Sequence, residues 1–116
     1  MKDTMESGAW VITRFEDSGK DETNHFSGYD FTFGADGRLF AENGLNSYEG
    51  TWSIVRSNSN DDSPDDFHFN ISFQLSNEFG DLSDDWNVLS NSEVKMELID
   101  VSGGNGGTDY LTLEKK

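Results

Sequence analysis

The sequence predicts an all-β fold, an eight-stranded antiparallel up-and-down meander barrel. Phe67–Leu75 alternates apolar and polar residues throughout, which is typical of a strand with one face on a core and the other in water. Asp36–Gly37 and Asn43–Gly44 each separate two strand-like runs, and such dipeptides are strong signals of tight hairpins. A meander of eight strands removes its exposed edges most simply by closing into a barrel. A two-sheet sandwich is the alternative if the first strand does not pair with the last.

Residues 8–116 are expected to form this single β-barrel domain, whereas residues 1–7 lack periodicity and are expected to be a flexible start. One short helical turn is expected near residues 77–84, because Phe79 and Leu82 stand one turn apart among polar residues. The expected strands are Gly8–Phe15, Tyr29–Phe33, Arg38–Glu42, Ser47–Val55, Phe67–Leu75, Trp86–Leu89, Glu93–Val101 and Thr108–Lys115. Exposed loops are expected at Ser57–Asp66 and Ser102–Gly107.

The connection Glu16–Gly28 is longer than a usual hairpin loop and contains Phe26, which suggests a partial lid over one end of the barrel. Both faces of the first strand are partly apolar. Trp10 and Ile12 share one face with Arg14, so Arg14 could meet an anionic head group if that face points inward; a surface arginine is the alternative.

The composition restricts the partners. The chain of 116 residues has 23 acidic against 8 basic side chains and a net charge of −15, which disfavours nucleic acid and anionic lipid surfaces. Basic partners and cations remain compatible with this charge. There is no cysteine, and no apolar run approaches the length of a membrane helix, so we expect neither disulfides nor direct membrane insertion of this domain. The sequence leaves the oligomeric state open.

The predicted inward face is rich in large apolar side chains. These side chains either fill the barrel or line a pocket for a small apolar or amphipathic ligand, since both use the same residue types. The candidate ligand-binding residues are Trp10, Arg14, Phe26, Tyr29, Phe31, Phe33, Tyr48, Trp52, Phe69, Phe73, Trp86 and Met96.

No cofactor is expected, although the acidic loops could hold calcium, which prefers oxygen ligands on flexible segments. No stretch fits the EF-hand pattern, and a solvated acidic loop is the simpler interpretation. The candidate metal ligands are Asp61, Asp62, Asp65 and Asp66, with further acidic groups at Asp81, Asp84 and Asp85 and at Asp17, Asp21 and Glu22.

The sequence argues against an enzyme. His25 and His68 are far apart in the sequence, one in a loop and one on the water face of a strand, so neither is well placed to form a catalytic triad. Ser92–Lys95 matches Ser-x-x-Lys only at the start of a strand, where the match has no structural context. Among the expected inward positions only Asp100, at a rim, carries a carboxylate, so a pair for glycoside hydrolysis is lacking.

Several motifs resemble those of a known family. Gly8-Ala9-Trp10 resembles the Gly-x-Trp motif that opens lipocalins. Gly50-Thr51-Trp52, the later Trp86-x-Val88 and the terminal Leu-Thr-Leu-Glu-Lys are similar to lipocalin-like domains of exported Bacteroidetes lipoproteins. The resemblance implies a β-barrel protein that is exported and lipid-anchored in the bacterial cell envelope. Lipocalins usually place an arginine over the first tryptophan, whereas this chain has only Lys115 and Lys116 near its last strand.

Two hypotheses of function follow. The first is a non-enzymatic envelope protein that binds a small apolar or amphipathic molecule at the open end of the barrel. The second is a structural or interaction module with a filled barrel, whose acidic loops bind a protein partner or calcium.

Overall fold

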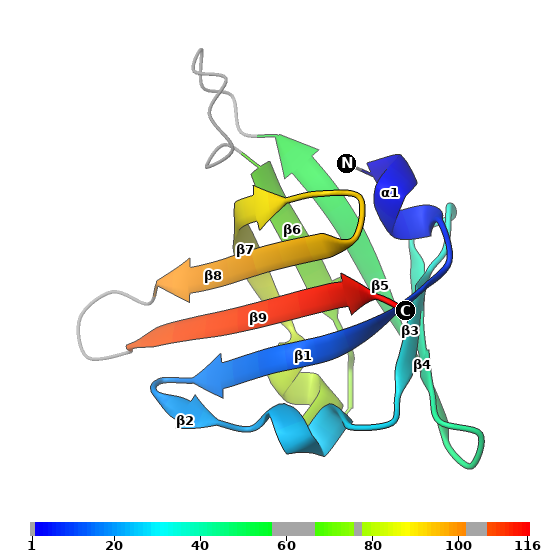
Figure 1. Cartoon of the computed structure of the whole chain (residues 1–116), viewed down its shortest axis with the longest axis horizontal. Helices are drawn as coiled ribbons and strands as arrows, with labels where there is room; N and C mark the ends of the chain where they lie inside the picture. The colour runs from blue at the N-terminus through cyan, green and yellow to red at the C-terminus, as the bar shows by residue number, and fades with distance from the viewer. Residues whose placement is uncertain (1, 57–66, 76–77, 102–106) are drawn as a thin grey trace.

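A computed structural model describes residues 2–56, 67–75, 78–101 and 107–116, and these form a closed antiparallel barrel (Figure 1). Its eight strands are β1 (Ala9–Asp17), β3 (Asp30–Phe33), β4 (Arg38–Glu42), β5 (Ser47–Arg56), β6 (Phe67–Ser72), β7 (Asp84–Asn91), β8 (Lys95–Val101) and β9 (Thr108–Lys115). Neighbours in sequence pair around the wall, and β1 pairs with both β3 and β9. The first strand therefore meets the last, and the predicted barrel is confirmed in preference to a sandwich.

The two predicted hairpins are present. Gly37 and Gly44 both have positive φ, at 88° and 91°, in the turns that join β3 to β4 and β4 to β5. A side chain at either position would be strained, so the Asp-Gly and Asn-Gly dipeptides are well suited to these turns. The bounds predicted for β4 and β9 agree with the structure at both ends.

The first strand contains an irregularity that its apolar pattern did not reveal. The β1–β9 register shifts between Ile12, which faces Leu113, and Arg14, which faces Thr112. Such a bulge reverses the alternation of side chains along a strand. Trp10, Ile12 and Phe15 are consequently all buried, while Arg14 lies on the outside.

Short helices close the two ends of the barrel (Figure 1). The helix α1 (Lys2–Glu6) lies at the end of the barrel where β1 begins and β9 finishes, and we call this end the α1 end. Residues 1–7 were expected to be a flexible start, so this helix was not predicted. At the opposite end lie η1 (Thr23–Phe26) and η3 (Glu78–Leu82), and we call this the η end. Helix η3 is the predicted helical turn. The predicted lid Glu16–Gly28 consists of the end of β1, the extra strand β2 (Lys20–Asp21) and η1.

The strand β6 is shorter than its alternation predicted. Beyond Ser72 the chain leaves the sheet, because the Phe73 backbone N–H donates to the Ser83 hydroxyl at 2.7 Å and the Phe73 carbonyl accepts from it at 3.1 Å. Phe73 remains buried, but Leu75 is 37% exposed and does not belong to the core. Val94 lies within the strand expected at Glu93–Val101, but it precedes β8 and is also exposed.

Among the described residues, no helix is long and apolar enough to cross a membrane.

Candidate functional site

The candidate ligand-binding residues lie in the barrel core, with two exceptions. Tyr48 is only partly buried, and Arg14 is exposed on the outer surface. The Arg14 guanidinium pairs with Glu16 and stacks on the Tyr110 ring, with Cζ 4.4 Å from the ring centroid. The β1 bulge thus removes Arg14 from any interior site, and the surface alternative holds.

One side chain fills the centre of the η end. Phe79, on η3, is fully buried and contacts five aromatic rings at centroid distances between 4.7 and 6.1 Å. These rings come from η1, the residue before β3, β3 itself, β5 and the segment after β6, so Phe79 contacts both the strands of the wall and the segments that close this end. The five rings belong to Phe26, Tyr29, Phe31, Tyr48 and Phe73. The sequence placed Phe79 in a helical turn but gave no sign that it enters the core.

A second ring cluster lies nearer the α1 end. Phe33, Trp52 and Phe69 contact one another pairwise at 5.1 to 5.7 Å. The Trp52 indole N–H donates to the Gly34 carbonyl at 2.9 Å, so its polar atom is satisfied inside the wall. Aromatic rings from several strands therefore pack on one another in both halves of the barrel.

Lys115, at the end of β9, lies over the ring of the first tryptophan. Its Nζ atom lies 5.5 Å from the centroid of the Trp10 ring, within the range of a cation–π interaction. In this chain a lysine therefore lies over the first tryptophan.

Three carboxylates gather at the rim of the η end. Asp84 at the start of β7, Asp100 near the end of β8 and Asp109 near the start of β9 each bring an oxygen within 4.8 Å of the others. We call these three residues the acidic rim. Asp100 faces Asp109 across the β8–β9 pair, and both share their strand face with the buried Leu98 and Leu111. The sequence pointed to Asp84 and Asp100 separately and missed Asp109, and only the strand register brings the three together.

Burial and mutual repulsion keep a proton on the acidic rim. Burial is the main cause that raises the pKa of Asp84 to about 7, and the hydrogen bond with the Asp100 carboxyl adds to it. Burial also raises the pKa of Asp109, against the Ser18 backbone N–H, which donates to its Oδ1 at 2.9 Å and lowers it. Nearby Asp17 raises the pKa of Asp109 further. Asp84 therefore keeps a proton under mildly acidic conditions and is hydrogen-bonded to Asp100.

This proton makes stability depend on pH. Since the pKa of Asp84 rises from 3.8 in the unfolded chain to about 7 in the fold, the folded state holds more protons between these values. The free energy of unfolding should therefore fall as pH rises from about 4 to 7, by about 1–2 kcal/mol once solvent screening is discounted. Urea titrations at several pH values in this range should show this decrease in the free energy of unfolding, and the decrease should be smaller in Asp84→Asn. An equal slope in the variant would contradict the assignment to Asp84.

The acidic rim has the donor chemistry for a hard divalent cation, but the carboxylates by themselves do not distinguish a cation from a proton. To distinguish cation binding from protonation, the melting temperature is compared in millimolar calcium and in chelator, for the unaltered protein and for Asp84→Asn. The acidic loop predicted as a metal site, with Asp61, Asp62, Asp65 and Asp66, lies outside the described residues.

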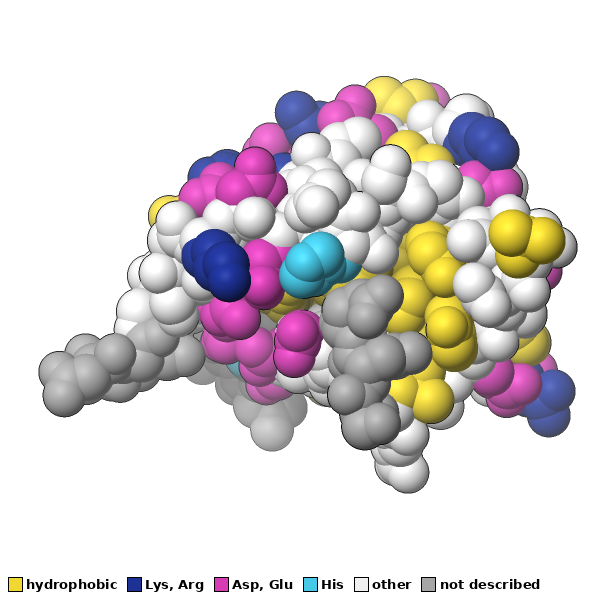
Figure 2. All heavy atoms as spheres, turned by 90° about the horizontal axis from the view of Figure 1, so that it is seen from below, with side chains coloured by type: hydrophobic (Ala, Val, Ile, Leu, Met, Phe, Trp, Pro, Cys, Tyr) yellow, Lys and Arg dark blue, Asp and Glu magenta, His cyan; other side chains and the backbone are white. Residues whose placement is uncertain are grey.

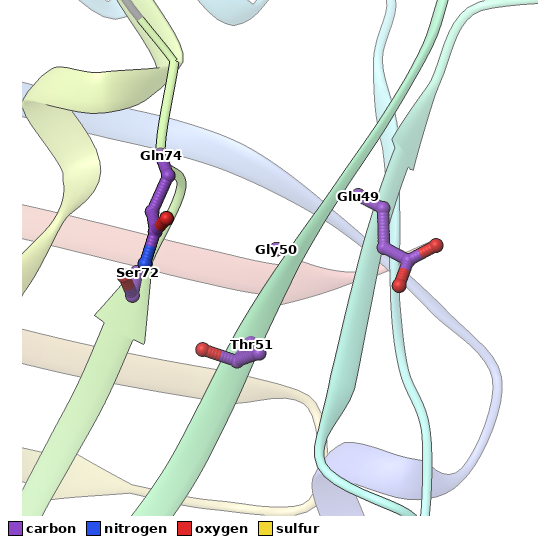
Figure 3. A pocket seen from close by; sticks show the side chains of 5 residues that line it. All are labelled: Glu49, Gly50, Thr51, Ser72 and Gln74. Atoms are coloured by element: carbon purple, nitrogen blue, oxygen red, sulfur yellow. The ribbon is translucent and has the colours of Figure 1, made fainter.

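The outer surface carries a polar depression between β5 and β6 (Figure 3). It has a volume of about 310 Å³ and is lined by Glu49, Gly50, Thr51, Ser72 and Gln74. The Thr51 side chain points toward the β6 side of the gap, while Glu49 points to the other side of β5 (Figure 3). This wall can offer hydrogen bonds to a polar surface.

A histidine–aspartate pair lies on the outside of the barrel. His68 Nδ1 and Asp85 Oδ1 are 3.1 Å apart on neighbouring strands, where both side chains are partly exposed. The pair joins β6 to β7 and lies away from the barrel interior, as expected for the water face of β6.

The closed wall and the ring-filled interior define an eight-stranded antiparallel β-barrel. A crystal structure of a DUF4847 family protein from Bacteroides vulgatus ATCC 8482 is similar, with a TM-score of 0.61 and 17% sequence identity, over 99% of this chain and 96% of that chain. At this identity the similarity shows the fold alone. No family model matches the sequence, and no curated protein matches it.

Proposed function

We propose that this chain is a non-enzymatic interaction module of the bacterial cell envelope, with a filled barrel and a functional outer surface. The observation that supports this proposal is the contact of Phe79 with five rings from different segments, because these rings occupy the space that an interior ligand would need. Of the two functions that the sequence suggests, the packing favours the interaction module.

A basic protein is the partner that the charge favours. The net charge of −15 gives the surface a negative field, which attracts a positively charged partner and repels anionic ones. Figure 2 shows acidic side chains gathered on one part of the η end, beside a patch of exposed hydrophobic side chains. A surface that carries both acidic and hydrophobic side chains can combine electrostatic attraction with apolar contact. Affinity that did not weaken with rising salt concentration would contradict a partner bound through charge.

The filled interior can be tested with an environment-sensitive apolar dye and a panel of lipids. We expect no saturable binding to the unaltered protein, because no bulky ligand can enter between rings in contact. Phe79→Leu is the matched positive control, since the smaller side chain leaves a cavity at the centre of the η end. Saturable binding of the dye or of a lipid to the unaltered barrel would refute the filled interior and favour the ligand-binding alternative.

The envelope location rests on the lipocalin-like motifs around Trp10, Trp52 and Trp86. Cell fractionation of the native source, with metabolic labelling by a fatty acid, tests export and lipid anchoring together. Recovery of unlabelled protein in the cytoplasmic fraction would overturn this part of the proposal.

A further inference from the structure

The strand β8 is apolar on both of its faces. Met96 and Leu98 are buried in the core, whereas Ile99 and Val101 lie on the outside of the barrel. Ile99 is partly exposed, and Val101 is 63% exposed. Strands that are covered on both sides have such sequences, whereas a strand with one face in water alternates apolar and polar residues. The outer face of β8 therefore has the composition of a covered surface.

The neighbouring strands extend this apolar surface. Figure 1 shows β7, β8 and β9 side by side in the wall, and Ile99 faces Tyr110 of β9 on one side and Asn87 of β7 on the other. Leu89 is the extra residue of a bulge in β7, and it is 45% exposed beside the pair of Asn87 and Ile99. Contiguous exposed apolar surface marks an interaction site. We call the four apolar residues the outer strip: Leu89, Ile99, Val101 and Tyr110.

The charges around the outer strip are balanced. Three carboxylates border it, and each has a partner on the outer wall. The pairs are Glu16 with Arg14, Glu97 with Lys95 at 3.4 Å, and Asp85 with His68 at 3.1 Å. A basic partner would gain little at this face, because these carboxylates are already paired. Most of the net charge of −15 is therefore carried by other surfaces of the protein.

We propose that the outer strip is the contact between two copies of this chain in a weak, reversible dimer. Two copies of net charge −15 repel each other, and this repulsion is smallest where both surfaces are close to neutral. A twofold dimer brings the same patch together from both copies, so a patch with both signs of charge can match itself. The inference goes beyond the proposed function, which concerns a basic partner.

The extent of the outer strip determines how strong this dimer can be. The strip spans three strands of the wall, or roughly 10 Å at about 4.8 Å between neighbouring strands. An interface of this extent lies at the small end of specific contacts, where association is weak and transient. We therefore expect a Kd on the order of 100 μM for the dimer.

Sedimentation equilibrium over a range of protein concentrations measures this Kd. Ile99→Lys should raise the Kd at least tenfold, because it places an ammonium group in the apolar contact. This substitution makes the net charge less negative, so stronger repulsion between the copies cannot be the cause. The matched control is Leu45→Lys, which makes the same change of charge at a residue that is 92% exposed in the turn between β4 and β5. The control should leave the Kd nearly unchanged.

The effect of salt distinguishes this dimer from the binding of a basic partner. Salt screens the repulsion between two acidic copies, so the dimer should become tighter as the salt concentration rises. A basic partner bound through charge should instead bind more weakly. Either inference can therefore fail without the other. A dimer that weakened with salt would depend on ion pairs between the copies, which would contradict an apolar contact.

Two further results would overturn the proposal. One is a monomer at every concentration up to about 1 mM, tenfold above the expected Kd. The other is an equal Kd in Ile99→Lys and Leu45→Lys. Because Ile99 is partly buried, circular dichroism first checks that its variant is folded. If Ile99→Lys does not fold, the more exposed Leu89 takes its place. Leu89→Lys should then raise the Kd at least tenfold, and an unchanged Kd would refute the contact.

Discussion

Phe79→Ala is expected to lower the free energy of unfolding by about 3–5 kcal/mol, in the range of large-to-small substitutions at fully buried aromatic positions. Phe79 is completely buried and is the one ring of its cluster that touches all five others. Its removal leaves a cavity that rings held by separate strands cannot close by a small shift. Denaturant titration measures the loss.

The control for this prediction is Leu45→Ala, in the turn between β4 and β5. Leu45 is 92% exposed, so the same kind of truncation should leave the free energy of unfolding nearly unchanged. A loss below about 1 kcal/mol in Phe79→Ala would mean that η3 can collapse into the space, and the account of Phe79 as the central side chain would fail.

Gly50→Ala is expected to destabilise the barrel by about 2–3 kcal/mol through overpacking. A Cβ atom at Gly50 would overlap the Ser72 carbonyl oxygen and stand 2.8 Å from Cδ1 of Phe73. The first neighbour is backbone, and the second is a ring packed against Phe79, so neither can give way easily. Thermal unfolding followed by circular dichroism measures the shift.

Thr51→Ala is the neighbouring control for Gly50→Ala. Thr51 is exposed on the outer face of β5, so truncation there should cost far less than adding a methyl group at Gly50. Equal melting temperatures for Gly50→Ala and the unaltered protein would show that β5 and the chain after Ser72 can move apart to make room for the methyl group without loss of stability.

The strands could be predicted because the local signals agree with one another. Alternation in β6 and the turn dipeptides at Gly37 and Gly44 fixed which faces point inward and where the chain reverses. The β1 bulge had no such signal, because Val11 is apolar on the opposite face and the pairing with β9 decides the register. Arg14 was therefore the residue whose side could not be predicted.

The candidate sites were less predictable because they depend on distant parts of the chain. Asp84, Asp100 and Asp109 come from three strands, and only the register around the wall brings their oxygens together. A five-residue segment such as α1 has no periodicity long enough to recognise, since tertiary burial of Met5 determines its structure. Composition revealed an acidic protein, but it could not show which carboxylate keeps a proton in the fold.

The pairing of β1 with β9 also determines when the barrel can form. β1 has only two paired positions with β3, at Ala9 and Trp10, whereas its pairing with β9 extends from Trp10 to Glu16. Contacts between such distant parts of a chain are slow to form, because the closure of a long loop precedes the gain from pairing. During synthesis β1 therefore lacks its main partner until Thr108–Lys115 has left the ribosome. Until then the barrel stays open along β1.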